Sequence, residues 1–193
     1  AEEYLSGRVT DKLQTAERMK QSSPNLIDYD KNISALKEVQ PAPVKAAEIA
    51  VRVGTSWIDK ELYKEFFCQL IALPYYMRDG IELYYNKHDG SWRIDRTTGY
   101  VRNFRTMNVT SVYGTERANA YRLFEDCLNQ RSTQIYDTVL DADGREKRVL
   151  NNSETVAARE KQNKIVEAFK DWIFRDPERR EELEGGYNRL FNQ

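Results

Sequence analysis

Arginine and aromatic residues are interspersed along residues 92–122, and this is the part of the chain whose residue types could bind a ligand. Only two acidic residues, Asp95 and Glu116, lie in this segment. A guanidinium can bind a phosphate through two parallel hydrogen bonds, and an aromatic ring can stack on an exposed base. The segment therefore predicts contacts with DNA. The candidate residues are Arg93, Arg96, Arg102, Arg105, Arg117, Arg122 and Tyr100.

The same pattern also fits ordinary surface arginines around aromatic residues of a core, and the sequence leaves this alternative open. In strands, alternate residues share a face, so Arg93 would lie beside Asp95, and Arg102 beside Phe104. Some of the arginines would then lie across from the core rather than all in one patch.

The residues that catalysis, a nucleotide or a metal ion would need are not arranged for those roles. The sequence has no Gly-x-Gly and no Gly-x-x-x-x-Gly-Lys, the glycine patterns that bind dinucleotides and ATP phosphates. No Asp or Glu precedes a Lys by two residues, as a common Mg²⁺-dependent nuclease would require. His88 is the only histidine, and Cys68 and Cys127 lie too far apart to form a close pair of zinc ligands. We therefore expect no catalytic residue, bound metal or cofactor in this chain.

Composition and charge are typical of a globular chain without a net attraction for nucleic acid or membrane. Thirty basic residues oppose thirty-one acidic ones, and hydrophobic residues make up 40%. A DNA-binding surface must therefore come from uneven placement of charge. No apolar run approaches the ~20 residues that span a bilayer, so we expect no membrane segment. Two distant cysteines without a secretory signal predict free thiols and a cytoplasmic location. The polar start without Met indicates a piece of a longer protein.

Residues 1–43 are expected to form a helical connecting arm. Apolar residues recur at helical spacing over residues 4–21 and 25–39, which gives each segment a narrow apolar stripe. Pro24 separates the two segments, and Pro41 ends the second. Each stripe needs a neighbouring element to cover it.

Residues 44–193 are expected to form an α+β accessory domain, in which small antiparallel hairpins pack with helices and two helices end the chain. Asp-Gly turns mark two hairpins, over residues 81–95 and 134–150. Asn151 followed by Glu154 predicts a capped helix start. The predicted elements are a strand over 48–53, a helix that Asp59 or Ser56 can cap and that runs to about Leu73, strands over 81–86 and 91–95, an extended and partly irregular segment over 101–112, a helix over 115–129, strands over 134–140 and 146–150, a helix over 151–174, and a last helix that begins at Asp176-Pro177.

Four stretches are distinctive enough to compare with known proteins. They are Ala35–Pro41, Val51–Ile58, Tyr113–Tyr121 and Lys170–Arg180. In this order and spacing they resemble a segment of very large proteins of phages and conjugative elements. Those proteins join an N6-adenine DNA methyltransferase to an SNF2-type DNA helicase. The resemblance covers nearly the whole chain, although Gly185-Gly186 departs from the family pattern and leaves the continuity of the last helix in doubt.

In that family the segment lies between the methyltransferase domain and the helicase ATPase core. The resemblance implies a parent that binds DNA, ATP with Mg²⁺, and S-adenosylmethionine, and it implies that both flanking domains of the same polypeptide are partners. It transfers no catalytic residue, because no Asn-Pro-Pro-aromatic, Asp-Pro-Pro-Tyr or Asp-Glu-x-His motif occurs here. The expected role is a non-catalytic accessory or linker domain that helps the parent engage DNA. The alternative is a purely structural spacer that docks the methyltransferase on the helicase core.

Overall fold

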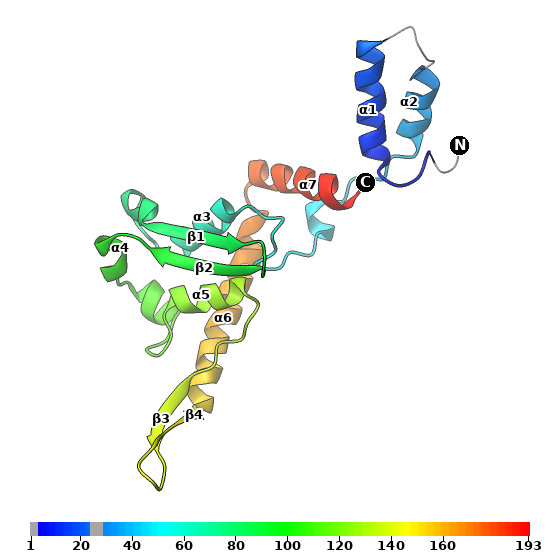
Figure 1. The fold of residues 1–193 in the computed structure, drawn as a ribbon. Coiled ribbons are helices and arrows are strands. Elements are labelled where there is room, and N and C mark those ends of the chain that lie inside the picture. The colour runs from blue at the N-terminus through cyan, green and yellow to red at the C-terminus, as the bar shows by residue number, and fades with distance from the viewer. Residues whose placement is uncertain (1–3, 24–28) are drawn as a thin grey trace. The chain divides into compact units, whose positions relative to one another are not determined.

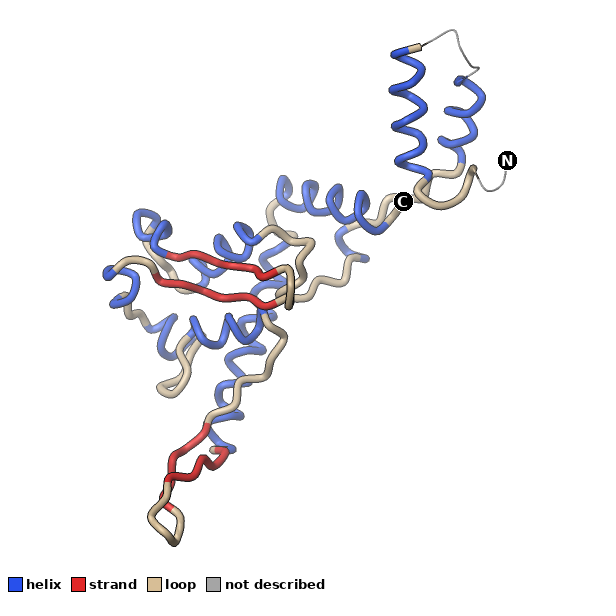
Figure 2. The backbone as a smooth tube through the Cα atoms, viewed as in Figure 1, coloured by secondary structure: helices blue, strands red, loops and turns tan. Residues whose placement is uncertain are grey.

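The structure is a computed structural model that describes residues 4–23 and 29–193. Within these ranges the chain forms helices and two separate two-stranded antiparallel sheets (Figure 2), so the α+β class predicted from the sequence is confirmed. Contacts divide the chain into two compact units, residues 51–176 and residues 1–50 together with 177–193. The predicted domain boundary after residue 43 stays a prediction.

The larger unit, residues 51–176, contains both hairpins and the helices that form its core. Asparagine and aspartate side chains begin its main helices: Asp59, Asn119 and Asn151 each accept a backbone N–H of the first turn. Such caps satisfy amide groups that would otherwise have no partner. The elements are α3 (Lys60–Leu70), the 3₁₀ helix η2 (Tyr75–Gly80), β1 (Ile81–Asn86), β2 (Ser91–Arg96), α4 (Gly99–Asn103), the π-helix η3 (Asn108–Val112), α5 (Ala120–Leu128), β3 (Tyr136–Leu140), β4 (Glu146–Leu150) and α6 (Asn152–Ile173).

Aromatic side chains from α3, α5 and α6 form the centre of this unit. The rings of Phe67 and Phe124 are stacked with their centroids 4.8 Å apart, and those of Tyr63 and Phe169 are stacked at 5.4 Å. All four side chains are fully buried. Because an aromatic pair contributes about 0.5–1.5 kcal/mol beyond its buried area, these contacts fix the three helices against one another.

The β1–β2 hairpin has a buried and an exposed face. Its register places Ile81 opposite Arg96 and Tyr85 opposite Trp92. Directly opposed residues share a face of the sheet. Ile81 and Trp92 are buried, so Arg96 lies at the end of the inner, buried face. Tyr84 is opposite Arg93 and belongs to the outer face.

The β3–β4 hairpin is the most exposed part of this unit. Figure 1 shows it extending away from β1 and β2, next to the start of α6. The side chains of β4 are exposed along its whole length, and only Asp137 of β3 is half-buried. Apolar residues on both strands, including Leu140 and Val149, therefore contact solvent.

The second unit contains α1 (Val9–Ser22), α2 (Tyr29–Glu38), the short 3₁₀ helix η1 (Ala46–Glu48) and α7 (Pro177–Phe191). Val9 and Ala16 of α1 pack with Ile33 and Leu36 of α2 to form a small core. The apolar stripes predicted for the two helices therefore pack against each other, although α1 begins five residues later than predicted. The part of the predicted second helix before Tyr29 lies outside the described residues.

Side chains of α7 hold the segment that follows α2. Asn188 accepts the backbone N–H of Val44 through Oδ1 at 2.8 Å and donates from Nδ2 to the Val44 carbonyl at 2.9 Å. Glu184 accepts the N–H of Ala46 at 2.7 Å. The helix runs unbroken through Gly185-Gly186, so this pair does not interrupt it.

Three predicted elements are wrong. Residues 48–53 form no strand, because the alternation there reflects burial of Ile49 and Val53, and both ladders among the described residues lie elsewhere. Residues 101–112 are not extended but contain α4 and η3. Thr98 caps α4 by accepting the N–H of Val101, and the Asn108 side chain donates to the Leu70 carbonyl at 3.0 Å.

The third wrong element is the start of the helix predicted at Thr115. Its hydroxyl accepts the backbone N–H groups of Arg117 and Ala118, at 3.3 and 3.0 Å, which closes a separate turn. Asn119 then caps α5. The remaining helices and both hairpins of this unit agree with the sequence to within three residues.

Candidate nucleic-acid interface

Two side chains of the α5 region hold the edge of β2 against that helix. Asn129 accepts the Trp92 backbone N–H at 2.8 Å and donates to the Trp92 carbonyl at 2.9 Å. Glu125 accepts the Ile94 N–H at 2.8 Å. These contacts satisfy backbone groups that an unpaired sheet edge would leave open. As a result, Arg96 at the end of β2 is positioned beside the first turns of α5.

Arg96 lies over the aromatic ring of Tyr121, with its guanidinium carbon 4.6 Å from the ring centroid. Tyr121 is buried, whereas Arg96 is half-buried and lines the surface. Burial raises the pKa of the Tyr121 hydroxyl, and the nearby charges of Arg96 and Arg105 oppose that rise. A cation over a ring is attracted by the negative face of the π-system, so Tyr121 fixes the position of Arg96 without neutralising it.

Arg102 and Arg105 are held by backbone carbonyls. The Arg102 Nε donates to the Arg96 carbonyl at 2.8 Å. The Arg105 guanidinium donates to the carbonyls of Arg102 and Phe104, at 2.9 and 3.1 Å. Carbonyls orient a guanidinium but carry no net charge, and in the described part of the chain neither arginine forms an ion pair. Both are exposed and keep their full positive charge for a ligand.

Arg117 and Arg122 lie on the other side of Arg96. Arg122 donates to the Gln134 carbonyl at 3.1 Å. Arg117 forms an ion pair with Asp137 at 2.7 Å and donates to the Tyr136 carbonyl at 2.9 Å. The hydrogen bonds from Arg117 and Asn151 hold the pKa of the Asp137 carboxyl below its usual value. Arg117 is thus partly neutralised, whereas Arg122 is not.

Two surface hollows that meet at Arg96 connect these side chains. One, of about 310 Å³, is lined by Arg96, Arg117 and Arg122 together with Glu125. The other, of about 580 Å³, is lined by Arg96 and Arg102 together with Asp95. Ile94 also lines both, so the two hollows are neighbours. Four arginines line these hollows, and Arg105 adjoins them through its hydrogen bond to the Arg102 carbonyl. The five residues, called the arginine surface here, are Arg96, Arg102, Arg105, Arg117 and Arg122.

Arg93 does not belong to the arginine surface. It lies on the outer face of the hairpin, over the Tyr84 ring at 4.7 Å and in an ion pair with Asp95 at 3.0 Å. The sequence correctly placed Arg93 and Asp95 on one face of a strand. The same reasoning was wrong for Arg102, which lies in α4 and not in a strand.

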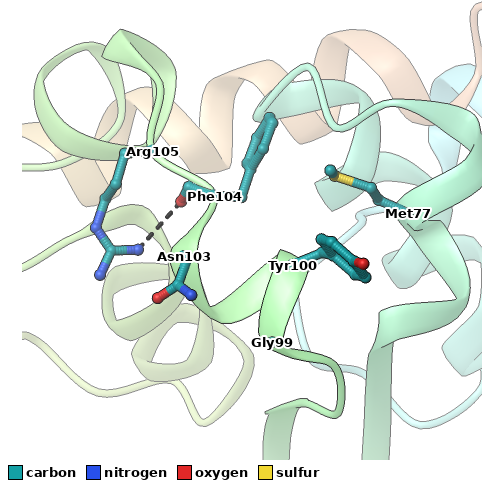
Figure 3. A pocket seen from close by; sticks show the side chains of 6 residues that line it. All are labelled: Met77, Gly99, Tyr100, Asn103, Phe104 and Arg105. Atoms are coloured by element: carbon teal, nitrogen blue, oxygen red, sulfur yellow. Dashed lines mark hydrogen bonds between the residues drawn. The ribbon is translucent and has the colours of Figure 1, made fainter.

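Tyr100 stands next to the arginine surface and borders a third hollow, of about 550 Å³. Figure 3 shows its ring facing Met77, with Phe104 behind and the side chains of Asn103 and Arg105 on the other side. The Tyr100 side chain is 79% exposed. Met77 and Asn103 were not among the candidates, since Met77 comes from η2, which precedes the first hairpin. The only sequence signal for Asn103 is its position between the candidates Arg102 and Arg105.

The histidine and the two cysteines, which the sequence analysis considered as metal ligands, lie outside the arginine surface. His88 is exposed in the turn between β1 and β2. Cys68 and Cys127 are free and buried, and burial raises the pKa values of their thiols to about 11 and about 12. Within residues 4–23 and 29–193, no three His, Cys, Asp or Glu side chains cluster as metal ligands would. No helix in the same ranges has the length and apolarity to cross a membrane.

Comparison with known proteins places most of the larger unit and α7 in one family. Residues 52–193 match the family described as a domain of unknown function, DUF8437. No curated protein matches the chain, and no solved structure matches it. The match covers about three quarters of the 193 residues. The chain therefore belongs to the DUF8437 family.

Proposed function

We propose that this chain is a non-catalytic accessory domain that binds DNA through the arginine surface. The observation that carries the proposal is the convergence of five arginines from β2, α4, α5 and the loops between them on one side of the larger unit. Guanidinium groups bind phosphate oxygens in a planar, two-pronged geometry that a lysine cannot reproduce.

The balance of charge on this surface supports the proposal. Five cations face three carboxylates, namely Asp95, Glu125 and Asp137. Asp95 is already paired with Arg93, and Asp137 with Arg117. The chain as a whole has a net charge of −1, so the positive charge is a local feature. A local excess of this kind attracts polyanions even when the net charge does not.

The arginines are suited to bind the phosphates of the DNA backbone rather than to recognise a base sequence. Contacts to phosphates fix the position of a protein on DNA but carry no direct sequence information. Such binding releases counterions and weakens steeply with salt. We infer a domain that keeps DNA in place for another part of a larger polypeptide.

The resemblance of four sequence stretches to methyltransferase–helicase proteins supports a proposal for what that larger polypeptide is. We propose a fusion of an N6-adenine DNA methyltransferase and an SNF2-type helicase, with this chain between the two. ATP with Mg²⁺ and S-adenosylmethionine would then bind the flanking domains and not this chain. The parent would act in the cytoplasm on the DNA of its host or of a mobile element.

Replacement of exposed arginines tests the DNA-binding proposal. The triple variant Arg102→Ala/Arg105→Ala/Arg122→Ala removes three charges that make no ion pair within the described ranges. We expect its affinity for short duplex and single-stranded DNA at low salt to fall by about tenfold or more, measured by fluorescence anisotropy. The matched control is Arg52→Ala/Arg159→Ala/Arg175→Ala, which removes the same charge from exposed positions outside the arginine surface. Equal losses in both variants, or no binding by the intact chain, would contradict the proposal.

A second candidate function is a structural spacer that docks neighbouring domains, and the β3–β4 hairpin favours it. Leu140 is 69% exposed, and Val139 and Val149 are each 42% exposed. Exposed apolar residues on an unpaired hairpin are typical of protein contacts. This function predicts that the chain co-elutes with a separately produced methyltransferase or helicase domain of the parent, and that Leu140→Lys/Val149→Lys abolishes co-elution. Failure to co-elute with either domain would count against it.

A further inference from the structure

The hollow beside Tyr100 combines features that match a nucleobase. Tyr100 and Met77 face each other across it, and Phe104 forms part of its wall (Figure 3). These groups offer flat or polarisable apolar surface, which is what the two faces of a base present. The volume of about 550 Å³ falls within the ~300–1,000 Å³ that is typical of small-molecule sites.

The position of Tyr100 is set by the local fold. Thr98 caps α4 and fixes the start of the helix, so that Tyr100 projects from its first turn. Val101, the next residue, is fully buried and anchors the helix in the unit. The ring of Tyr100 is therefore presented to solvent from an anchored backbone, and burial in the core does not account for it.

Polar groups lie where the edge of a base and its phosphate would lie. The Asn103 side chain borders the hollow and makes no hydrogen bond to any described residue, so its amide can donate and accept. Arg105 also borders the hollow, and its guanidinium donates to the Arg102 carbonyl at 2.9 Å. Arg102 lines the neighbouring hollow that continues to Arg96. The Tyr100 hollow thus lies next to the arginine surface and shares Arg105 with it.

We propose that this hollow binds an unpaired nucleobase of a DNA strand whose phosphates lie on the arginine surface. The Tyr100 ring stacks on the base, the Asn103 amide contacts its polar edge, and Arg105 binds the adjoining phosphate. In a duplex both faces of each base are covered by neighbouring bases, so a paired base cannot enter. The inference rests on the proposed DNA-binding function and adds to it a preference for single-stranded over duplex DNA.

Substitution of Tyr100 tests this proposal in the full chain. Base–aromatic stacking predicts that Tyr100→Ala weakens binding of a short oligothymidylate by about tenfold, whereas Tyr100→Phe retains the affinity. Binding of a duplex of the same length should be unchanged in both variants. The control is Tyr76→Ala, since Tyr76 is 80% exposed but does not line the hollow. Circular dichroism of each variant verifies that it is folded.

A base analogue gives a second readout. With 2-aminopurine within the single strand, binding to the intact chain should change its fluorescence, and Tyr100→Ala should remove that change. An unchanged affinity and fluorescence response in Tyr100→Ala, with the arginine triple variant still impaired, would overturn the nucleobase site and leave the DNA-binding proposal standing. An equal loss in Tyr76→Ala would also overturn it. Tighter binding of a ribo-oligomer than of DNA would assign the hollow to RNA and contradict the proposal.

Discussion

The guanidinium of Arg96 rests on the ring of Tyr121, 4.6 Å from its centroid, at the point where β2 and α5 meet. The Tyr121 ring also packs edge-to-face with Phe67 of the core, with the two ring centroids 5.1 Å apart. One residue therefore connects the aromatic core to the arginine surface. The Tyr121 hydroxyl is buried and has no hydrogen-bond partner among the described residues.

This geometry makes Tyr121→Phe a nearly neutral substitution. The ring that supports Arg96 remains, and the hydroxyl that is lost makes no bond, so the free energy of unfolding should stay the same or rise. The comparison is Tyr63→Phe, because the Tyr63 hydroxyl donates to the Thr55 carbonyl and accepts from the Gly54 N–H, both at 3.0 Å. We expect Tyr63→Phe to cost about 1–2 kcal/mol. Urea denaturation measures both, and a larger cost for Tyr121→Phe would contradict the assignment.

Gly54 should tolerate no side chain. Its φ is +91°, and a Cβ there would lie 1.9 Å from the Leu128 carbonyl oxygen. Gly144 has a similar φ of +73° but open space around it. We therefore expect Gly144→Ala to cost about 1–2 kcal/mol, from backbone strain alone, and Gly54→Ala to cost clearly more. Thermal or urea denaturation compares the two, and equal costs would show that Gly54 does not pack against α5 as described.

Much of the fold follows from local signals. The Asp-Gly turns at Gly90 and Gly144 mark both hairpins, and the caps at Asn151 and Asp59 mark two helix starts, because each feature is determined by residues within a few positions. The predictions of extended structure for residues 48–53 and 101–112 were wrong for a common reason. Their apolar spacing shows only which residues are buried, and a strand also needs a partner strand that these segments do not have.

The candidate site could be predicted only in part. The sequence singled out six arginines and Tyr100 as a group because they lie close together in the chain, and the structure places Arg93 apart from the other five. Their convergence depends on the Asn129 and Glu125 contacts that attach β2 to α5, and on the cap at Thr98 that makes residues 99–103 helical. The Asn129 and Glu125 contacts join segments that are distant in sequence, and the Thr98 cap decides between a helical and an extended segment. The spacing of residues in the sequence does not determine either feature.

Buried thiols should make the protein less stable in alkali. Burial raises the pKa of Cys68 from 9.0 to about 11 and that of Cys127 from 9.0 to about 12. Well below pH 9 both thiols are protonated in the folded and unfolded states. As the pH rises through about 9 the unfolded chain loses protons that the folded chain retains, so the free energy of unfolding falls.

Urea denaturation between about pH 8 and pH 10.5 measures this decline. Cys68→Ala/Cys127→Ala should make it shallower, and Tyr63, whose pKa burial raises from 10.0 to about 12, should account for part of the remainder. The native thiols should also react slowly with a thiol reagent until the protein unfolds. A decline that is equally steep in the double variant would contradict the role of the thiols.

Release of Arg117 from its carboxylate should strengthen DNA binding. Asp137 pairs with Arg117 at 2.7 Å, and Asp137→Asn would remove the negative charge. We expect a severalfold gain in affinity and a salt dependence that is steeper by about one phosphate contact. Asp143→Asn, at an exposed position in the β3–β4 turn, changes the charge equally and is the control. An equal gain in both variants would indicate a general charge effect and not the release of Arg117.

The dependence of DNA affinity on salt tests the central proposal most directly. The intact chain and the variant Arg102→Ala/Arg105→Ala/Arg122→Ala are titrated with single-stranded DNA between about 50 and 200 mM salt, and log affinity is plotted against log salt concentration. We expect a straight line for the intact chain and a slope that is smaller by about two in the variant, since each lost phosphate contact on a single strand removes ~0.7. Identical slopes, or no binding of DNA even at the lowest salt, would contradict the assignment of this surface to DNA.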